Sequence, residues 1–308
     1  MANIIEIKNL YKSYKDVKAV QDLSFCVKEG ELFAFLGVNG AGKSTTISMI
    51  CGTLEKDQGK IYINDKDMDK SREEIKKEIG VVFQNSVLDK ALSVYDNLKY
   101  RASLYNIYGK EFENRLNEVC KMLNLHDILK RSVGKLSGGQ VRRVDIARAI
   151  IHNPKILFLD EPTTGLDPHT RKNVWDVVST LRNEHNVTVF LTTHYMEEAS
   201  DADYVIIIDQ GKIVAKGTPL ELKNSYTGDF ISIYNIEEEK VKLLNYPYIK
   251  TRDGFKIKVK DTSEATLLIK NHSELFEDYE VTKGKMDDVF LNVTGKKLEG
   301  GNNNEYSK

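Results

Sequence analysis

Hydrophobic and polar residues alternate over the first part of the chain, residues 4–36. Three apolar runs, IIEI, AVQDLSFCV and ELFAFLG, are separated by short polar turns. This pattern is typical of strands joined by tight connections. We therefore expect a mostly antiparallel entry that leads into a buried strand, and this strand ends in a glycine-rich loop.

Helix and strand patterns alternate after the loop. KSTTISMICGTL has the apolar spacing of a helix, whereas GKIYIND and IGVVFQN have the pattern of strands. The second of these strands is apolar enough to be buried on both faces. A strand, a loop, a helix and a further strand in this order predict a parallel sheet and an α/β fold.

Strand patterns disappear between residues 90 and 150. Three segments there, YDNLKYRASLYNIY, EFENRLNEVCKMLNL and GGQVRRVDIARAIIH, have the spacing of amphipathic helices. Strand patterns return in KILFLD, VTVFLTTH and YVIIID, alternate with helices at 168–185 and 195–202, and end in a hairpin near residue 217. The sequence predicts one domain over residues 1–220, with a helical subdomain inserted at about 90–150.

A different pattern begins after TPLELKNSYTG. It runs strand, helix, two strands that turn at Asp253 and Gly254, helix, strand and a final helix. We therefore predict a small α+β accessory domain of the ferredoxin-like type over residues 228–297. The polar end of the chain, residues 298–308, is rich in glycine and asparagine and is predicted to be disordered.

Composition narrows the class of protein. The 308 residues are 41% hydrophobic, enough for a substantial core, and 45 Lys+Arg against 46 Asp+Glu give no basic excess. We therefore expect no nucleic-acid partner. Cys26, Cys51 and Cys120 show no C-x-x-C pairing, which favours reduced thiols over zinc or disulfides. No apolar run reaches ~18 residues and no secretion signal is present, so work at a membrane would need another chain as the anchor.

The segment GVNGAGKS, Gly37 to Ser44, matches G-x-x-x-x-G-K-[ST] between a predicted strand and a predicted helix. Its glycines allow backbone N–H groups to surround phosphates, Lys43 can reach the β- and γ-phosphates, and the Ser44 hydroxyl can bind Mg²⁺. An ordinary glycine turn is the alternative. The residues expected to bind ATP in this loop are Gly37, Val38, Asn39, Gly40, Ala41, Gly42, Lys43, Ser44 and Thr45.

Two carboxylates end the apolar run KILFLDEP. Asp160 and Glu161 follow a strand that we expect to lie beside the loop strand, at the sheet edge where ligand sites open. Asp160 is predicted to hold the metal, directly or through water, and Glu161 to polarise the attacking water as a general base. Alone, such a pair would usually be a solvated strand end.

Two further polar residues follow strands at the same edge. His194, at the end of VTVFLTTH, can hydrogen-bond the γ-phosphate and orient the water, although a lone histidine is more often structural. Gln84 ends IGVVFQ, and its amide can contact Mg²⁺ or the water. The predicted catalytic residues are Lys43, Gln84, Glu161 and His194, and the predicted metal ligands are Ser44, Gln84 and Asp160.

The segment LSGGQ, residues 136–140, has the features of a second phosphate-binding helix start. Ser137, Gly138 and Gly139 supply a hydroxyl, backbone N–H groups and the positive end of a helix dipole. These groups suit an anion that approaches from outside the chain. The sequence therefore contains two candidate phosphate sites.

Taken in order, these motifs resemble the ATP-binding subunit of ABC transporters over residues 1 to about 220. The resemblance implies a P-loop NTPase core with a RecA-like mixed sheet. It identifies GVNGAGKST as the Walker A loop, ILFLDE as Walker B, Gln84 as the Q-loop and His194 as the switch histidine. It further implies that Asp167 ends the D-loop and that Tyr14 stacks on adenine, although Tyr11 is close by and either ring can simply pack in its strand. The family signature consists of Ser137, Gly138, Gly139 and Gln140 after Leu136.

The same resemblance implies how the protein works. Two ATPase subunits, identical or different, would pair head to tail, so that each signature seals the other subunit's ATP. Mg²⁺ would be the metal, and a separate transmembrane permease would dock in the groove around residues 84–105. The subunit would be cytoplasmic and peripheral on the cytoplasmic face of the cell membrane.

Three stretches, LTTHYMEEAS, GGQVRRVDIARA and MDDVFLNVTGKK, resemble ATPases of drug, antibiotic and polysaccharide exporters, with Asp287 in place of the commoner glutamate. The transported substrate does not follow from the sequence. A regulatory or nucleic-acid-associated ABC ATPase is the alternative. The coiled-coil or zinc insertion of DNA-acting relatives and the tandem cassettes of ribosome-acting ones are not found in the sequence.

Overall fold

The computed structural model describes residues 2–295 of the chain. These residues form two compact units, and the boundary between the units runs within strand β10. The first unit holds Met1–Tyr195, as far as described, and Ala202–Ile213, and the second holds Met196–Asp201 and the described residues from Val214 onward. The predicted tail, 298–308, lies outside the described residues.

The first unit begins with a four-stranded antiparallel sheet in the order β2-β1-β4-β5. Buried and exposed residues alternate along much of β2, which is why the period-two pattern was visible in the sequence. The expected antiparallel entry is confirmed. The strands are β1 Asn3–Tyr14, β2 Val17–Lys28, β4 Gln58–Ile63 and β5 Lys66–Asp67.

The central sheet has six strands in the order β10-β9-β3-β8-β7-β6. The pairs β9/β3, β3/β8, β8/β7 and β7/β6 are parallel, as predicted for this part of the chain. Every residue of β3 and β8 is buried, which explains the continuous apolar runs. The strands are β3 Leu32–Leu36, β6 Ile79–Val82, β7 Ile156–Asp160, β8 Thr188–Thr193, β9 Tyr204–Asp209 and β10 Lys212–Gly217.

One predicted neighbour relation is wrong. The Walker B strand β7 does not lie beside the loop strand β3, because β8 lies between them and pairs with both. All three strands are parallel, so their carboxyl ends still open at one edge of the sheet. Because β8 lies between β3 and β7, the carboxyl end of β8 lies at the centre of this edge.

A hydrophobic core joins the two sheets of the first unit to helix α1, Lys43–Ile50. Phenylalanine rings form its centre: the Phe33 and Phe190 ring centroids are 5.0 Å apart, and Phe25 of the antiparallel sheet lies 5.5 Å from Phe33. Burial of each such ring contributes about 1.5–3 kcal/mol. This packing fixes the strand from which the glycine-rich loop emerges.

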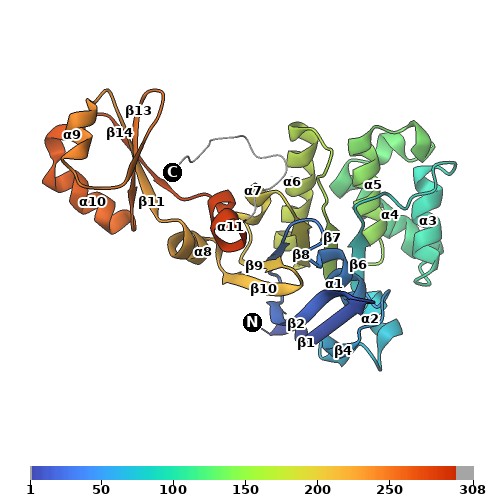
Figure 1. The fold of residues 1–308 in the computed structure, drawn as a ribbon. Coiled ribbons are helices and arrows are strands. Elements are labelled where there is room, and N and C mark those ends of the chain that lie inside the picture. The colour runs from blue at the N-terminus through green and yellow to red at the C-terminus, as the bar shows by residue number, and fades with distance from the viewer. Residues whose placement is uncertain (1, 296–308) are drawn as a thin grey trace. The chain divides into compact units, whose positions relative to one another are not determined.

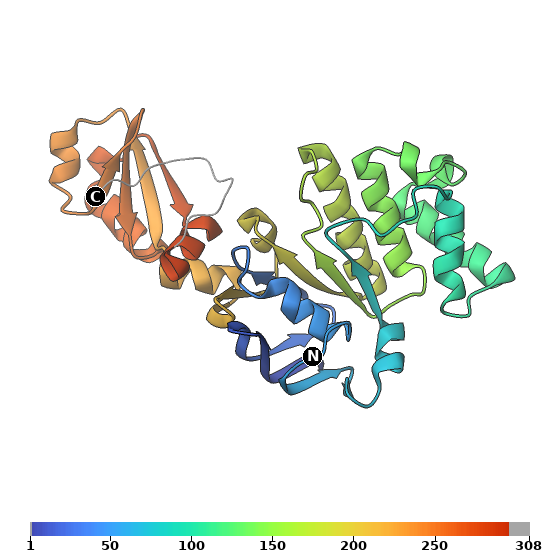
Figure 2. The ribbon, with the colours of Figure 1, turned by 45° about the vertical axis from the view of Figure 1, so that its right-hand side comes forward.

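Three helices, α3, α4 and α5, pack against one another in the segment where strand patterns are missing (Figure 1, Figure 2). They are the three helices that the amphipathic spacing predicted. Asp167 caps the next long helix, α6, by accepting a hydrogen bond from the Thr170 N–H at 3.0 Å. The helices of the first unit, besides α1, are α2 Arg72–Glu78, α3 Val94–Ser103, α4 Gly109–Leu123, α5 Gly138–Ile150 and α6 Pro168–His185, with short 3-10 helices at His126–Ile128 and Val133–Lys135.

The second unit contains an antiparallel sheet in the order β12-β13-β11-β14. Strand and helix follow one another as βαββαβ, and this strand order interleaves the two βαβ halves, as in a ferredoxin-like fold. Its own core lies between the sheet and helices α9 and α10. The elements are β11 Asp229–Tyr234, α9 Glu238–Lys242, β12 Tyr248–Lys250, β13 Gly254–Val259, α10 Thr262–Asn271, the 3-10 helix Ser273–Leu275 and β14 Tyr279–Lys283.

Three further helices of the second unit lie outside this sheet domain. Helix α11 packs against both α7 and α8. Among the described residues, no helix of either unit is long and apolar enough to cross a membrane. The three helices are α7 Met196–Ala199, α8 Pro219–Tyr226 and α11 Met286–Thr294.

Candidate active site

The glycine-rich loop connects β3 to α1. Gly42 has φ +108°, and a Cβ there would lie 2.4 Å from the carbonyl oxygen of Ala19, so only glycine fits this close approach. Gly42 is also the N-cap of α1 and offers no side chain to the first N–H groups of the helix. Such a helix start is suited to bind an anion.

Lys43 lies inside this loop. Its ammonium donates hydrogen bonds to the carbonyl oxygens of Gly37, at 2.6 Å, and Val38, at 3.3 Å. Burial lowers the pKa of Lys43, and the carboxylates of Glu161 and Asp160 partly offset this effect. A phosphate group beside Lys43 would compensate this buried positive charge more fully than neutral carbonyls do.

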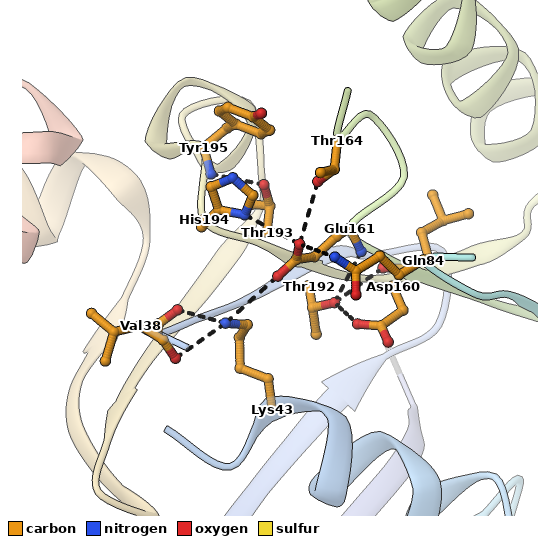
Figure 3. Close-up of polar contacts among 12 residues, drawn as sticks. Val38, Lys43, Gln84, Asp160, Glu161, Thr164, Thr192, Thr193, His194 and Tyr195 are labelled. Atoms are coloured by element: carbon orange, nitrogen blue, oxygen red, sulfur yellow. Dashed lines mark hydrogen bonds and ion pairs between the residues drawn. The ribbon is translucent and has the colours of Figure 1, made fainter. Parts of the chain in front are cut away.

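The carboxylate of Glu161 is the meeting point of the site (Figure 3). Its Oε2 accepts a hydrogen bond from Gln84 Nε2 at 3.0 Å and from Thr164 Oγ1 at 3.3 Å. His194 Nδ1 lies 3.3 Å from the same oxygen, and Lys43 Nζ lies 3.9 Å from Oε1. The structure therefore brings together the four residues that the sequence placed in the catalytic group, from the ends of β6, β7 and β8 and the start of α1.

The backbone of Glu161 explains the direction of its side chain. Glu161 has φ +46°, a conformation that is uncommon for residues other than glycine. Its N–H donates to the carbonyl oxygen of Thr192 at 3.0 Å. Such backbone strain persists only where the surroundings hold it, and it is concentrated at functional sites.

Asp160 is the last residue of β7 and lies in register with Thr192 of β8. Thr192 Oγ1 donates a hydrogen bond to Asp160 Oδ1 at 2.5 Å. Burial raises the pKa of Asp160, and the neighbouring negative charge of Glu161 acts in the same direction. A cation near this carboxylate would favour its charged form.

The oxygen donors of the three residues predicted to hold the metal fit Mg²⁺ in kind. They are a carboxylate, the hydroxyl of Ser44, which is exposed at the start of α1, and the amide oxygen of Gln84, which takes no part in the contact with Glu161. Mg²⁺ prefers such oxygen ligands and is usually held by one or two carboxylates together with substrate phosphates.

Two threonines and a tyrosine belong to the site but were not identified from the sequence. Thr164 and Thr192 contact the two carboxylates, and the ring of Tyr195 lies 4.2 Å from the ring of His194. The guanidinium of Arg171 lies 4.4 Å from the centre of the Tyr195 ring. The register between β7 and β8 would have indicated Thr192, but register is set by packing and not by a motif.

The signature residues form the exposed start of α5. Ser137 caps the helix by accepting from the Gln140 N–H at 3.3 Å, and Gln140 Oε1 accepts from the Ser137 N–H at 3.0 Å. Among the described residues, no hydrogen bond or ion pair joins Ser137–Gln140 to the loop or to Glu161. The chain therefore holds its two candidate phosphate sites apart, and the second faces solvent.

The ring of Tyr14 is 46% exposed at the end of β1, and Lys12 Nζ lies 5.7 Å from its centre. Tyr11, the alternative, is half-buried in the same strand. Tyr14 therefore offers the more open ring face. Of the remaining predicted loop residues, Asn39, Gly40 and Ala41 lie between β3 and α1, and Thr45 lies in the first turn of α1.

Comparison with known proteins gives consistent matches. A family model described as "ABC transporter" matches residues 20–164. The linearmycin resistance ATP-binding protein LnrL of Bacillus subtilis is 34% identical, with 96% of this chain and 99% of that protein covered. The daunorubicin resistance ATP-binding protein DrrA2 of Streptomyces coeruleorubidus is 32% identical, with 96% of each covered.

Among solved structures, the ATP-binding cassette MJ0796, a dimer in a post-hydrolysis state with ADP and Pi, superimposes with a TM-score of 0.64. It is 29% identical, and the match covers 70% of this chain and 98% of that one. The two relatives match over nearly the whole length of this chain and are at least 32% identical to it. The chain therefore belongs to the ABC transporter family, and it is an ATP-binding ATPase subunit of that family.

Proposed function

We propose that the chain powers export through a separate transmembrane permease, as a peripheral subunit on the cytoplasmic face of the membrane. The names of LnrL and DrrA2 connect these relatives with resistance to antibiotics. Both matches span the second unit as well as the first, so the similarity is not limited to the cassette that all ABC proteins share. We further propose that residues 1–220 form the ATPase domain and residues 228–297 an accessory domain.

Glu161 is the general base in this proposal, and the convergence of Gln84, His194 and Lys43 on its carboxylate carries the argument (Figure 3). Its carboxylate takes the proton of the attacking water while His194 and Gln84 orient that water. Lys43 leaves the carbonyl oxygens of the loop and binds the β- and γ-phosphates.

Mg²⁺ is the proposed metal. Asp160, Ser44 and Gln84 would hold it, and its chemistry is to neutralise charge on the phosphate oxygens. Tyr14 is proposed to stack on the adenine. All the remaining loop residues contribute backbone N–H groups to the phosphates.

Two subunits are proposed to sandwich each ATP, with the exposed start of α5 in one chain closing the γ-phosphate face of the other. Ser137 and the N–H groups of the first turn supply the contacts, and the dipole of α5 favours an anion. To change the ratio of closed to open dimers from 1:99 to 99:1 takes about 5.5 kcal/mol of differential binding. About half of this free energy from each of the two γ-phosphates is therefore sufficient.

The first test is steady-state ATP hydrolysis by Glu161→Gln. We expect kcat to fall at least about 10²-fold, because the amide cannot accept the proton, while ATP binding remains. Glu184→Gln, an exposed glutamate of α6, is the matched control and should behave as wild type. A Glu161→Gln protein that hydrolyses ATP at the wild-type rate would contradict the assignment.

A further inference from the structure

We infer that Arg142, one turn into the helix that begins with the signature, is a positioning residue that holds the backbone of Glu161 and of the segment before Gln84. This inference rests on the proposed role of Glu161 as the base. In this inference Arg142 contacts neither the nucleotide nor the attacking water. Its effect is exerted through the peptide groups that it fixes.

The guanidinium of Arg142 is buried, with 6% of the residue exposed, and at the site it donates hydrogen bonds to backbone carbonyl oxygens. Nε lies 2.5 Å from the oxygen of Pro162, and Nη1 lies 2.6 Å from the oxygen of Phe83. Nη2 lies 3.3 Å from the oxygen of Glu161 and 3.5 Å from that of Asp160. One side chain thereby joins α5 to the ends of β6 and β7.

The contact with Glu161 supports an unfavourable backbone conformation. The peptide N–H of Glu161 donates to Thr192, and its carbonyl oxygen accepts from Arg142 Nη2 at 3.3 Å and from the Thr164 N–H at 3.4 Å, so the residue is restrained on both sides at φ +46°. Without Arg142, buried carbonyl oxygens would lose a charged donor, and the strained conformation would lose the charged one among its restraints. The carboxylate would then leave its position.

The contact with Phe83 acts on Gln84, which hydrogen-bonds to the carboxylate of Glu161. Phe83 directly precedes Gln84, whose amide donates to the Glu161 carboxylate (Figure 3). One turn further along α5, Asp145 accepts a hydrogen bond from Ser86 Oγ at 3.1 Å. This is a second contact between α5 and the segment around Gln84. Arg142 therefore sets both ends of the Gln84–Glu161 contact.

The position of Arg142 has a consequence for the paired enzyme. In the proposed dimer, the start of α5 covers the ATP bound to the partner subunit. One turn later, Arg142 of the same helix donates a hydrogen bond to the backbone of Glu161, the general base of its own chain. A shift of α5 on binding the partner's nucleotide would therefore reach Glu161 through one rigid guanidinium.

The neighbouring arginine is a matched control. Arg143 lies on the same helix, is half-buried, and donates to the carbonyl oxygens of Leu123 and Asn124, both at 3.2 Å, at the end of α4. Arg143→Met removes the same charge and the same number of side-chain atoms as Arg142→Met. Within residues 2–295, its hydrogen bonds go to the end of α4 and not to the site.

The experiment compares Arg142→Met, Arg142→Lys and Arg143→Met in ATP turnover and in binding of ATP. We expect Arg142→Met to lower kcat by about 10–100-fold, because small misplacements of a catalytic group cost this much, with the Kd for ATP changed less than about 2-fold. Arg142→Lys should restore part of kcat, since it keeps the charge but not the fork of donors. Thermal unfolding of all variants shows whether each is folded at the assay temperature, and the lysine variant carries the test if Arg142→Met does not fold.

A double variant separates this inference from the proposed function. In the Glu161→Gln background, Arg142→Met should lower kcat less than about 2-fold further, because a residue that acts through Glu161 has nothing left to position. If Arg142→Met turns over ATP like Arg143→Met while Glu161→Gln is impaired, the inference is wrong and the proposed function stands. Additive losses of kcat in the double variant also overturn the inference. So does an Arg142→Met protein whose ATP affinity falls by as much as its kcat. An unimpaired Glu161→Gln overturns the proposed function itself.

Discussion

Two helices of the first unit, α1 and α5, both begin with glycines, and the two starts are built differently. The start of α1 has no capping side chain, and the ammonium of Lys43 lies in its loop. The start of α5 is closed by a capping box between Ser137 and Gln140, and a Cβ on Gly138 would meet no atom within 4 Å.

The difference shows what each start is prepared to bind. At α1 the phosphate must replace contacts that Lys43 makes with its own loop, and the sheet edge with Asp160 and Glu161 supplies the remaining groups. At α5 the Gln140 N–H is used by the capping box, and Ser137 and Gly138 at the helix start are exposed. In the proposed mechanism the first start is the floor of the active site, and the second closes the nucleotide site of the other subunit.

The largest expected effect is at the two starts themselves. Lys43→Ala should lower ATP hydrolysis by about 10³-fold or more, because the charge on the γ-phosphate loses its buried counter-ion. Ser137→Arg should lower it to a similar extent, because the arginine blocks the surface that closes the partner's site. Steady-state turnover of each purified variant measures both losses.

Mixing the two variants distinguishes a closing surface from a site used within one chain. In a mixed pair, one composite site combines both changes and the other has neither, so part of the lost turnover should return. Mixtures that remain as inactive as the separate variants would show that the two starts do not act in trans.

A smaller effect is expected at the far end of α5. His152 follows this helix, donates from Nε2 to the carbonyl oxygen of Ile79 at 3.0 Å, and stacks on Tyr105 with 3.8 Å between ring centroids. Burial lowers the pKa of His152 to about 4. The unfolded chain, with a histidine pKa near 6.5, binds the proton first, so folding stability should fall by about 3 kcal/mol as the pH drops from about 7 to 4.

His152→Phe keeps the stacking on Tyr105 and removes the titration. The difference in free energy of unfolding between wild type and this variant should therefore shrink or reverse toward pH 4, which denaturant unfolding at several pH values measures. Parallel pH curves for the two proteins would contradict the buried neutral histidine.

The smallest effects separate the two glycines of the signature. A Cβ on Gly139 would lie 2.6 Å from Thr170 Cγ2 of α6, within the same chain. Gly139→Ala should therefore destabilise the fold by about 1–3 kcal/mol. Gly138→Ala should change stability by less than about 0.5 kcal/mol, since it meets open space and alanine favours a helix.

Gly138→Ala is then tested by the ATP turnover of the assembled enzyme. Thermal unfolding should be near wild type, while turnover falls if the partner's nucleotide approaches this surface closely. Equal stability losses for both alanine variants would show that the packing of Gly139 on Thr170 is not what requires glycine there.

Much of the fold followed from local patterns. The period-two alternation of β2, the apolar runs of β3, β7 and β8, and the amphipathic spacing of α3, α4 and α5 each reflect burial that repeats with the element's own period. The motif around Lys43 predicted its loop, because the Gly42 conformation and the helix start depend on residues next to each other. These features are set within a few residues of chain.

Other features depended on contacts between distant segments. The sequence predicted β7 beside β3, but the order of parallel strands is decided by how α6 and the other crossovers pack, and β8 lies between them. Thr192 entered the site for the same reason. Arg142 had the pattern of an ordinary helical arginine, since nothing in the sequence shows which carbonyl oxygens it meets.

The sequence by itself determined which chemical groups the protein carries and at which strand and helix ends they stand, because motifs and periodicity are local properties of the chain. Only the tertiary structure decided that Gln84, His194 and Lys43 all meet at Glu161, that Glu161 is held at positive φ, and that the helix of the signature grips its backbone. The physical reason is that distance, register and burial between segments far apart in sequence are set by packing of the whole core, and packing cannot be read from one segment at a time.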